Sequence, residues 1–338
     1  MSRLLVTLLF LSLALVRPAV SAEEVNLYSA RQEALIKPLL ERFTEQTGIK
    51  VNMVSAKDDA LIKRLESEGR NSPADLLLTA DAGRLHRARE LGVLAPLQSE
   101  VLTQRIPASY RDPDNHWFGL SLRARPILYV RGKVDPAELS TYAALADPRW
   151  KGRICIRSSD NIYNQSLVAS MIATQGEAAT EAWARGFVAN FARPPQGGDR
   201  DQIKAAAAGL CDVAIANTYY FAAMLNDANP AERETAAKLA VFWPDQDGRG
   251  VHVNVSGIGL TTAARNVDQA RRLMEFMVSD EAQRWYAEAN HEYPVVAGVA
   301  PSDTLKAWGE FKADDVNLSQ LGRHNADAVR LMDRAGWK

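Results

Sequence analysis

The sequence predicts an α/β fold of two lobes, each a doubly wound α/β sandwich, joined by strands that cross between them. The chain has 338 residues, which exceeds the usual size of one hydrophobic core, so two domains are expected. Strand-like and helix-like segments alternate from its start, which is typical of a doubly wound sheet. Two strand-like segments, 117–132 and 251–262, lie where the chain would leave the first lobe and return to it.

Residues 1–22 are typical of a secretory signal peptide. A basic start with Arg3 precedes the apolar stretch 4–16, which is too short to span a bilayer comfortably, and a Val-x-Ala sequence ends at Ala22. Cleavage after Ala22 would leave a mature chain starting at Glu23, exported to the periplasm and without stable membrane insertion. A retained N-terminal anchor is the weaker alternative.

The charge of the mature chain argues against a nucleic-acid partner. Removing the two arginines of the signal peptide leaves 38 basic against 41 acidic residues, a net charge of about −3. Proteins that bind nucleic acid carry a strong basic excess instead. The cargo or partner is therefore sought among other classes of ligand.

The first lobe begins with a regular alternation. Strands are predicted at 25–30, 49–56 and 74–80, and helices at 34–48 and 59–69, each helix closed by a glycine. Apolar residues recur at helical spacing in the helices, and the last strand is apolar throughout. This pattern predicts helices that cover a parallel sheet.

A second α/β unit follows the first crossing. It comprises a strand at 152–158, helices at about 161–175, 176–191 and 199–209, and a strand at 211–217 that leads into a helix with two adjacent tyrosines. After the return crossing, helices are predicted over 267–289 and near 323–335.

This order of elements gives the outline of a venus-flytrap binding protein. Residues 23–123 with about 250–300 are predicted to form the N-terminal lobe. Residues about 124–249 with 301–338 are predicted to form the C-terminal lobe.

The chain has two cysteines, Cys155 and Cys211, both in strand-like segments. In an oxidising compartment they could form a disulfide between neighbouring strands, and two buried free thiols are an equally good interpretation. A zinc site is disfavoured, because two cysteines without paired histidines make a poor ligand set.

Catalytic signatures are absent from the sequence. It contains no G-x-S-x-G, no Walker A loop, no G-x-G-x-x-G and no H-E-x-x-H. The histidines are scattered, and each is interpreted as a surface or hydrogen-bonded residue: His86, His116, His252, His291 and His324. The protein is therefore predicted not to be an enzyme, and a secreted hydrolase ranks as a remote alternative.

Three tyrosines stand at predicted strand-to-helix junctions. Tyr163 lies in "SSDNIYNQSL", with serine or aspartate as the candidate cap, and Tyr219 and Tyr220 lie in "NTYYFAAML", with Asn217 or Thr218 as the cap. Helix starts favour anions, so we expect these phenols to ionise more readily than their usual pKa of about 10. Three phenolates would match the charge of Fe(III), a hard cation that prefers oxygen donors. Consecutive helical residues point about 100° apart, so the tyrosine pair can converge only where the backbone is still turning into the helix.

The sequence resembles the periplasmic ferric-iron-binding proteins of ABC importers, in particular the tyrosine-rich class that includes the cyanobacterial ferric-binding proteins. The resemblance covers essentially the whole mature chain and includes "VNLYSARQ", "SPADLLLTADAGRL", "LSLRARPILY", "WKGRICIRSSDNIYNQSLVAS", "CDVAIANTYY" and "VNVSGIGL". It implies a two-lobed periplasmic-binding-protein (venus flytrap) fold of type II.

The resemblance also implies roles for individual residues. Tyr163, Tyr219 and Tyr220 fall on the family's phenolate ligands. Arg123 falls on a position that supports a ligand tyrosine or a synergistic anion such as carbonate, and Asn217 falls on an anion-contacting position.

The chain departs from the family pattern in the N-terminal lobe. Where relatives place a histidine or a His-Tyr pair after the first strand, it has Gln32 and Glu33, and where others place a glutamate it has Ala80 followed by Asp81. A bound anion or water would then complete the coordination, or Glu33 would supply a carboxylate. We favour the anion.

The resemblance implies a monomeric binding protein that delivers Fe(III) to an inner-membrane ABC permease and its ATPase. The alternative is a solute-binding protein of the same fold for another small ligand, such as an organic anion, a phosphonate or a polyamine.

Overall fold

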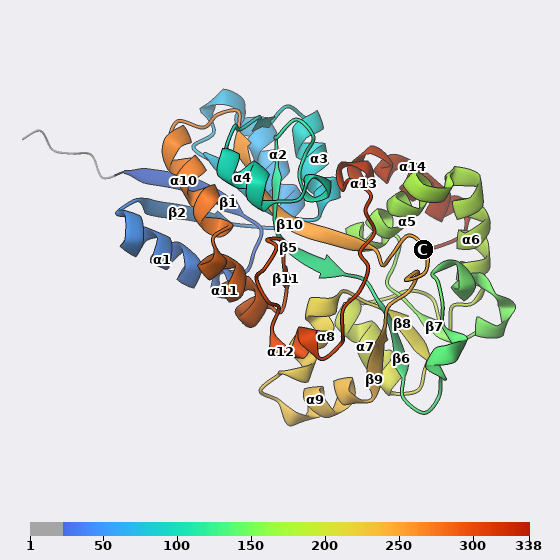
Figure 1. Cartoon of the computed structure of the whole chain (residues 1–338). Helices are drawn as coiled ribbons and strands as arrows, with labels where there is room; N and C mark the ends of the chain where they lie inside the picture. The colour runs from blue at the N-terminus through green and yellow to red at the C-terminus, as the bar shows by residue number, and fades with distance from the viewer. Residues whose placement is uncertain (1–22) are drawn as a thin grey trace, which may run out of the picture.

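The computed structural model describes residues 23–338, so the predicted signal peptide and its cleavage site lie outside the described residues. The described chain forms two lobes, each around its own β-sheet (Figure 1). Within it, one sheet has seven strands in the order β11-β5-β10-β3-β1-β2, with β4 paired to β10, and the other has four in the order β7-β8-β6-β9. No helix between residues 23 and 338 combines the length and apolar character needed to cross a membrane.

The N-terminal lobe contains the larger sheet and the helices packed on it. Its strands are β1 (Glu24–Ser29), β2 (Lys50–Ser55), β3 (Leu76–Ala80), β4 (Leu94–Ala95), β5 (Phe118–Ala124), β10 (Val253–Thr261) and β11 (Tyr293–Pro294). Its helices are α1 (Lys37–Thr47), α2 (Asp58–Glu68), α3 (Ala82–Glu90), α4 (Glu100–Arg105), α10 (Val267–Met277) and α11 (Asp280–Asn290).

The expectation of a parallel sheet is confirmed for β1, β2 and β3, which pair in parallel. The rest of this sheet is mixed, because β10 runs antiparallel to both β3 and β5. The cause lies in the connectivity, since β5 and β10 carry the chain out of the lobe and back again.

The C-terminal lobe contains the smaller sheet. Its strands are β6 (Ile127–Val130), β7 (Ile154–Cys155), β8 (Val213–Ile215) and β9 (Leu239–Phe242). Around them and in the C-terminal segment lie α5 (Ile162–Gln175), α6 (Glu177–Ala189), α7 (Asp199–Ala207), α8 (Thr218–Leu225), α9 (Pro230–Ala237), α12 (Asp303–Lys306), α13 (Ser319–Arg323) and α14 (Asn325–Arg334). The short helix α13 packs against α3 and α5, so the C-terminal segment contacts both lobes.

The first crossing is two strands rather than the single strand expected over 117–132. β5 belongs to the larger sheet and β6 to the smaller one, with Arg125 and Pro126 between them. Proline has no N–H to donate, so the ladder cannot continue through it. The Arg125 N–H instead donates to the carbonyl of His252, just before β10, at 3.0 Å. The two crossings therefore run side by side at the junction of the lobes (Figure 1).

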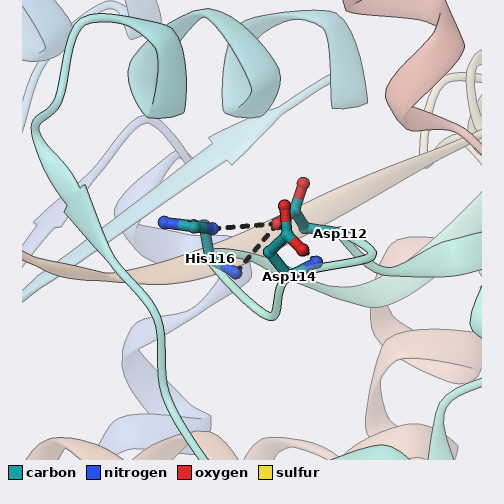
Figure 2. A group of neighbouring side chains, drawn as sticks. All are labelled: Asp112, Asp114 and His116. Carbon is teal, nitrogen blue, oxygen red and sulfur yellow. Dashed lines mark hydrogen bonds and ion pairs between the residues drawn. The ribbon is translucent and has the colours of Figure 1, made fainter.

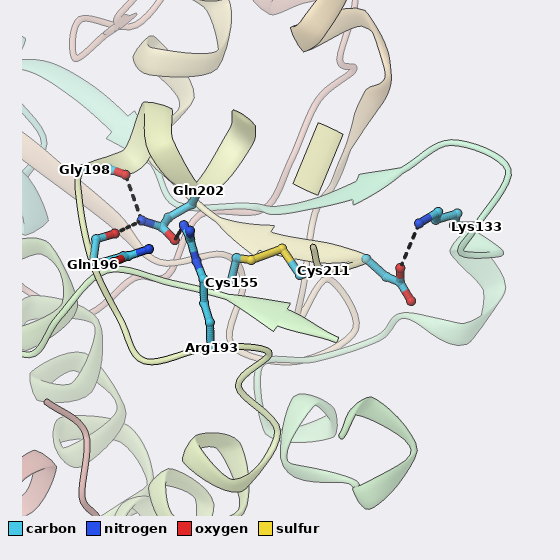
Figure 3. Close-up of a disulfide and its surroundings, with 8 residues drawn as sticks. Lys133, Cys155, Arg193, Gln196, Gly198, Gln202 and Cys211 are labelled. Carbon is cyan, nitrogen blue, oxygen red and sulfur yellow. Dashed lines mark hydrogen bonds and ion pairs between the residues drawn. A yellow bond between two sulfur atoms is a disulfide. The ribbon is translucent and has the colours of Figure 1, made fainter. Parts of the chain in front are cut away.

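Cys155 and Cys211 form a disulfide, which decides between the two interpretations of these residues (Figure 3). Cys155 ends β7 and Cys211 lies two residues before β8, and these strands pair in parallel. Both cysteines are buried in a small apolar cluster of the C-terminal lobe with Leu128 and Phe221. The bond therefore links two neighbouring strands that each lead towards a tyrosine-bearing helix.

Candidate functional site

A cavity of about 380 Å³ lies between the two lobes. On the N-terminal side, its wall includes the ends of β1, β3 and α11 together with part of β10. On the C-terminal side, it is formed mainly by the starts of α5, α7 and α8. The structure brings five of the predicted site residues together in its wall: Gln32, Arg123, Tyr163, Tyr219 and Tyr220.

The adjacent tyrosines converge because they occupy the first turn of a helix. Asn217 is the residue before α8, and Tyr219 and Tyr220 are the second and third residues of that helix. Their ring centroids lie 4.3 Å apart with the planes tilted by 39°. Both side chains are half-buried and face the same cavity.

Tyr163 reaches the same place from α5. The Asn161 side chain caps this helix and accepts a hydrogen bond from the Tyr163 N–H at 3.1 Å, so the predicted serine or aspartate cap is wrong. The Tyr219 hydroxyl donates to the Tyr163 hydroxyl at 3.1 Å. Two helices that begin 56 residues apart in the sequence thus present phenol oxygens within hydrogen-bonding distance of each other.

The expectation that the phenols ionise more readily than usual is wrong for Tyr163 and Tyr219. Burial raises the pKa of Tyr163 to about 12; the neighbouring Tyr220 adds to the rise and the Arg123 guanidinium opposes it. Burial also raises the pKa of Tyr219 well above its ordinary value, with Tyr163 contributing in the same direction. Loss of water around the oxygens outweighs the helix starts. A cation bound by Tyr163 and Tyr219 would therefore have to displace their protons.

Arg123 lies on β5 with its guanidinium 5.3 Å from the centre of the Tyr163 ring. The side chain is buried, and Nη2 donates to Asp81 Oδ2 at 3.2 Å. Its Nη1 has no hydrogen-bond partner among residues 23–338. This nitrogen is available to an anion or to a phenolate in the cavity.

Asp81 is fully occupied by the protein itself. Its Oδ1 accepts hydrogen bonds from the Gly83 N–H at 2.9 Å and the Ser166 hydroxyl at 2.8 Å. Its Oδ2 accepts hydrogen bonds from Arg123 and from Asn254 Nδ2, the latter at 2.8 Å. Asp81 does not line the cavity, so it is not placed to replace the glutamate that other members of the family carry near this position.

The structure places Asn217 beneath the cavity rather than in its wall. Its Oδ1 accepts a hydrogen bond from Arg125 Nη1 at 3.1 Å, and its N–H donates to Asp199 Oδ2 at 2.7 Å. These two buried partners occupy its Oδ1 and its N–H, whereas its Nδ2 has no hydrogen-bond partner among residues 23–338, so the contact of Asn217 with an anion stays a prediction. Its side chain does not cap α8 either.

The two N-terminal candidates separate from each other. Gln32 lines the cavity, but Glu33 begins the 3₁₀ helix η1 (Glu33–Leu35), is exposed and lies outside the cavity wall. Glu33 faces solvent because η1 turns the chain into α1 at this point.

Sequence reasoning missed an ion pair in the N-terminal wall. Arg31 and Glu292 form a double contact, with Arg31 Nη1 to Glu292 Oε1 at 3.2 Å, and both residues are largely buried. The Arg31 guanidinium lies 5.6 Å from the centre of the Tyr286 ring. No local pattern could predict this pair, because its members are 261 residues apart.

His291 is a second missed residue in this wall. It was interpreted as a surface or hydrogen-bonded histidine, but it lines the cavity in a left-handed backbone conformation with φ of 52°. Burial lowers its pKa, which favours the neutral ring. It follows that a neutral imidazole lies on the lobe that lacks the family's usual histidine.

Asp112, Asp114 and His116 form a separate cluster of possible metal ligands (Figure 2). Asp112 Oδ2 already accepts hydrogen bonds from the Asp114 N–H at 3.1 Å and from His116 Nδ1 at 3.0 Å. Arg89 forms ion pairs with both Asp112 and Asp114. The cluster therefore stabilises its own loop.

Comparison with known proteins places these features in context. The profile described as bacterial extracellular solute-binding protein matches residues 71–313. Iron uptake protein A1 of Synechocystis is 51% identical over 316 residues, covering 94% of this chain and 88% of that protein. The Fe(3+)-binding periplasmic protein of Serratia marcescens is 30% identical, covering 94% of this chain and 92% of its own.

Solved structures give the same picture. The Trichodesmium FutA structure in complex with iron and citrate ligands superposes with a TM-score of 0.91 at 52% identity, covering 93% of this chain and all of that one. The ferric binding protein from Campylobacter jejuni superposes with a TM-score of 0.88 at 41% identity, covering 93% of this chain and all of its own.

Proposed function

The chain belongs to the family of bacterial extracellular solute-binding proteins, and we propose that its solute is ferric iron, bound by the phenolates of Tyr163, Tyr219 and Tyr220. This membership confirms the family resemblance and the two-lobed binding-protein fold predicted from the sequence. Proteins of this family bind and carry solutes, so the hydrolase alternative is discarded.

The convergence of three phenols in one cavity between lobes carries the proposal. Once deprotonated, they supply three negative charges, which equals the charge of Fe(III), and their oxygens are hard donors. The Tyr219–Tyr163 hydroxyl distance of 3.1 Å shows that two of them already approach as closely as ligands of one ion must.

Arg123 holds an accompanying anion, with carbonate as one candidate. Its buried Nη1 lacks a partner among the described residues, and it lies beside the ring of Tyr163. An oxyanion there would complete the coordination sphere that Gln32 and Glu33 leave open on the N-terminal side. Since Glu33 lies outside the cavity wall, the arrangement favours the anion over a glutamate ligand.

Transport follows from the family. We propose that the protein is exported by residues 1–22 with cleavage after Ala22, acts in the periplasm as a monomer, and delivers iron to an inner-membrane ABC permease and its ATPase.

The test is a titration of the mature protein with ferric citrate. We expect a visible phenolate-to-iron charge-transfer band and one iron per chain by elemental analysis. Tyr219→Phe removes one phenolate and should weaken binding strongly and shift the band. Tyr129→Phe, on strand β6 outside the cavity wall, is the matched control and should leave both unchanged.

Two results would count against iron. A wild-type protein with neither band nor bound iron contradicts the proposal. Unchanged affinity of Tyr219→Phe for its ligand would favour the alternative cargo, an organic anion, phosphonate or polyamine, of which an anion would use Arg123 and Arg31 without the phenols.

A further inference from the structure

A buried polar network lies directly beneath the three tyrosines and is centred on Asp199. This residue is the first of α7, and its carboxylate is shielded from solvent. Its Oδ2 accepts a hydrogen bond from the Asn217 N–H at 2.7 Å and another from Arg125 Nη1 at 3.0 Å. Its Oδ1 accepts a third from Arg157 Nη1 at 3.3 Å.

These contacts reach the start of both tyrosine-bearing helices. Asn217 is two residues before Tyr219, so the bond from its N–H holds the backbone that enters α8. Arg157 is six residues before Tyr163, and Asn164 is the next residue after Tyr163. Arg125 joins Asn164 to Asp199, because its Nη2 donates to Asn164 Oδ1 at 2.7 Å while its Nη1 donates to Asp199.

The network also surrounds one phenol with charge. The guanidinium carbons of Arg123, Arg125 and Arg157 lie 5.3, 6.0 and 5.6 Å from the centre of the Tyr163 ring. Asp199 pairs with two of these arginines and so holds them in place. Moving them would change the field at the phenolate as well as its position.

We propose that Asp199 is a positioning residue for iron: it fixes the starts of α5 and α8 relative to each other, so that the phenols of Tyr163, Tyr219 and Tyr220 meet one metal ion. It touches no ligand itself and acts through Arg125, Arg157 and Asn217. This inference rests on the proposed function. Groups that orient metal ligands from behind typically change affinity by about 10- to 100-fold when they are removed.

The test is Asp199→Asn, which keeps the shape of the side chain but removes its charge and turns one acceptor into a donor facing arginines. We expect the iron complex to release iron to a competing chelator about 10- to 100-fold faster than wild type. We also expect its charge-transfer band to shift, because the phenolate–iron geometry and the field at Tyr163 both change. A purely structural role would lower the unfolding temperature and leave the band in place.

Asp201→Asn is the matched control. Asp201 lies on the same turn of α7 and carries the same charge, but it is exposed, and within residues 23–338 its carboxylate accepts a hydrogen bond only from the Gly198 N–H, at 2.6 Å. Its loss should weaken the start of α7 without changing the band or the release rate.

Asn164→Ala keeps the inference testable if Asp199→Asn does not fold. It removes the acceptor of Arg125 at the start of α5, together with the Asn164 Nδ2 hydrogen bonds to the carbonyls of Arg157 and Ser158. Since it leaves Asp199 and all charges in place, it should shift the band and speed release by a smaller factor. Wild-type spectra and release rates in a folded Asp199→Asn, or in Asn164→Ala where the first does not fold, would overturn the inference. A wild-type protein that binds no iron would overturn the proposed function instead.

Discussion

Burial decides the chemistry of the single residues in this site. Tyr163 and Tyr219 stand at helix starts, where a negative charge is favoured, but loss of solvent raises the pKa of both phenols. Tyr163 and Tyr219 therefore carry their protons near neutral pH. The proposed binding of iron by these phenols would therefore exchange the metal for protons.

We predict that the protein releases protons when it binds Fe(III). With the pKa of Tyr163 at about 12 and that of Tyr219 also raised, both phenols carry protons at pH 7 and lose them to Fe(III). Affinity at a fixed free Fe(III) concentration should rise with pH, by up to about 100-fold per unit from these two groups, and fall on acidification. Calorimetry in two buffers of different ionisation enthalpy, corrected for the chelator, measures the protons released.

The matched variant for this measurement is Tyr219→Phe, which should release about one proton fewer per iron bound. Binding of iron to wild type without proton release would show that the phenols are not the ligands.

At the scale of elements, the starts of α5 and α8 are held from two directions. Asp199 links them by hydrogen bonds, and the disulfide links the strands that precede them, with Cys155 opposite Ala214 in the parallel pair β7–β8. Tyr163 lies eight residues after Cys155, and Tyr219 lies eight residues after Cys211. The disulfide and the hydrogen bonds of Asp199 thus both restrain the segments that carry the phenols.

We expect the disulfide to stabilise the folded protein. It closes a sequence separation of 56 residues, for which loss of chain entropy in the unfolded state is worth about 4 kcal/mol. Cys155→Ala with Cys211→Ala should lower the free energy of unfolding by about 2–4 kcal/mol, measured by urea unfolding followed through tryptophan fluorescence. The control is wild type unfolded in the presence of a reductant, which should approach the midpoint of the variant. Equal midpoints for oxidised wild type and the double variant would contradict this account.

For the whole molecule, the C-terminal segment makes a contact that joins the two lobes. The cavity lies between the lobes, and α13 of the C-terminal segment packs against α3 of the N-terminal lobe and α5 of the C-terminal lobe. At this contact Gly322 meets the buried His86. A Cβ added to Gly322 would lie 2.3 Å from the His86 Cβ, closer than real atoms approach.

Gly322→Ala should therefore force α3 and α13 apart and destabilise the protein by about 1–3 kcal/mol. Thermal unfolding measures the loss, and small-angle scattering with and without iron measures any change in the arrangement of the lobes. Gly248→Ala is the control, because the nearest atom to its added Cβ is 3.7 Å away. A Gly322→Ala protein with wild-type stability and scattering would show that this contact does not constrain the lobes.

Local chemistry made much of this protein predictable from its sequence. The alternation of strands and helices is a pattern of neighbouring residues, and it predicted the two lobes and the crossings at 117–132 and 251–262. Tyr163, Tyr219 and Tyr220 were identifiable because each follows a strand and opens a helix. The resemblance to ferric-binding proteins depends on the same short motifs, and the family is confirmed.

Contacts between distant residues were decided only by the tertiary structure. Asp199 meets Arg125 across 74 positions and Arg31 meets Glu292 across 261, so no motif signals either pair. His291 lines the cavity because of how α11 packs, and Glu33 lies outside the cavity wall because the chain turns into α1 there. The protonation of the phenols follows from burial, a property of the folded molecule. The sequence by itself determined which phenol side chains are proposed as iron ligands, because their place at helix starts is a local property, and the fold decided how they are held, charged and enclosed.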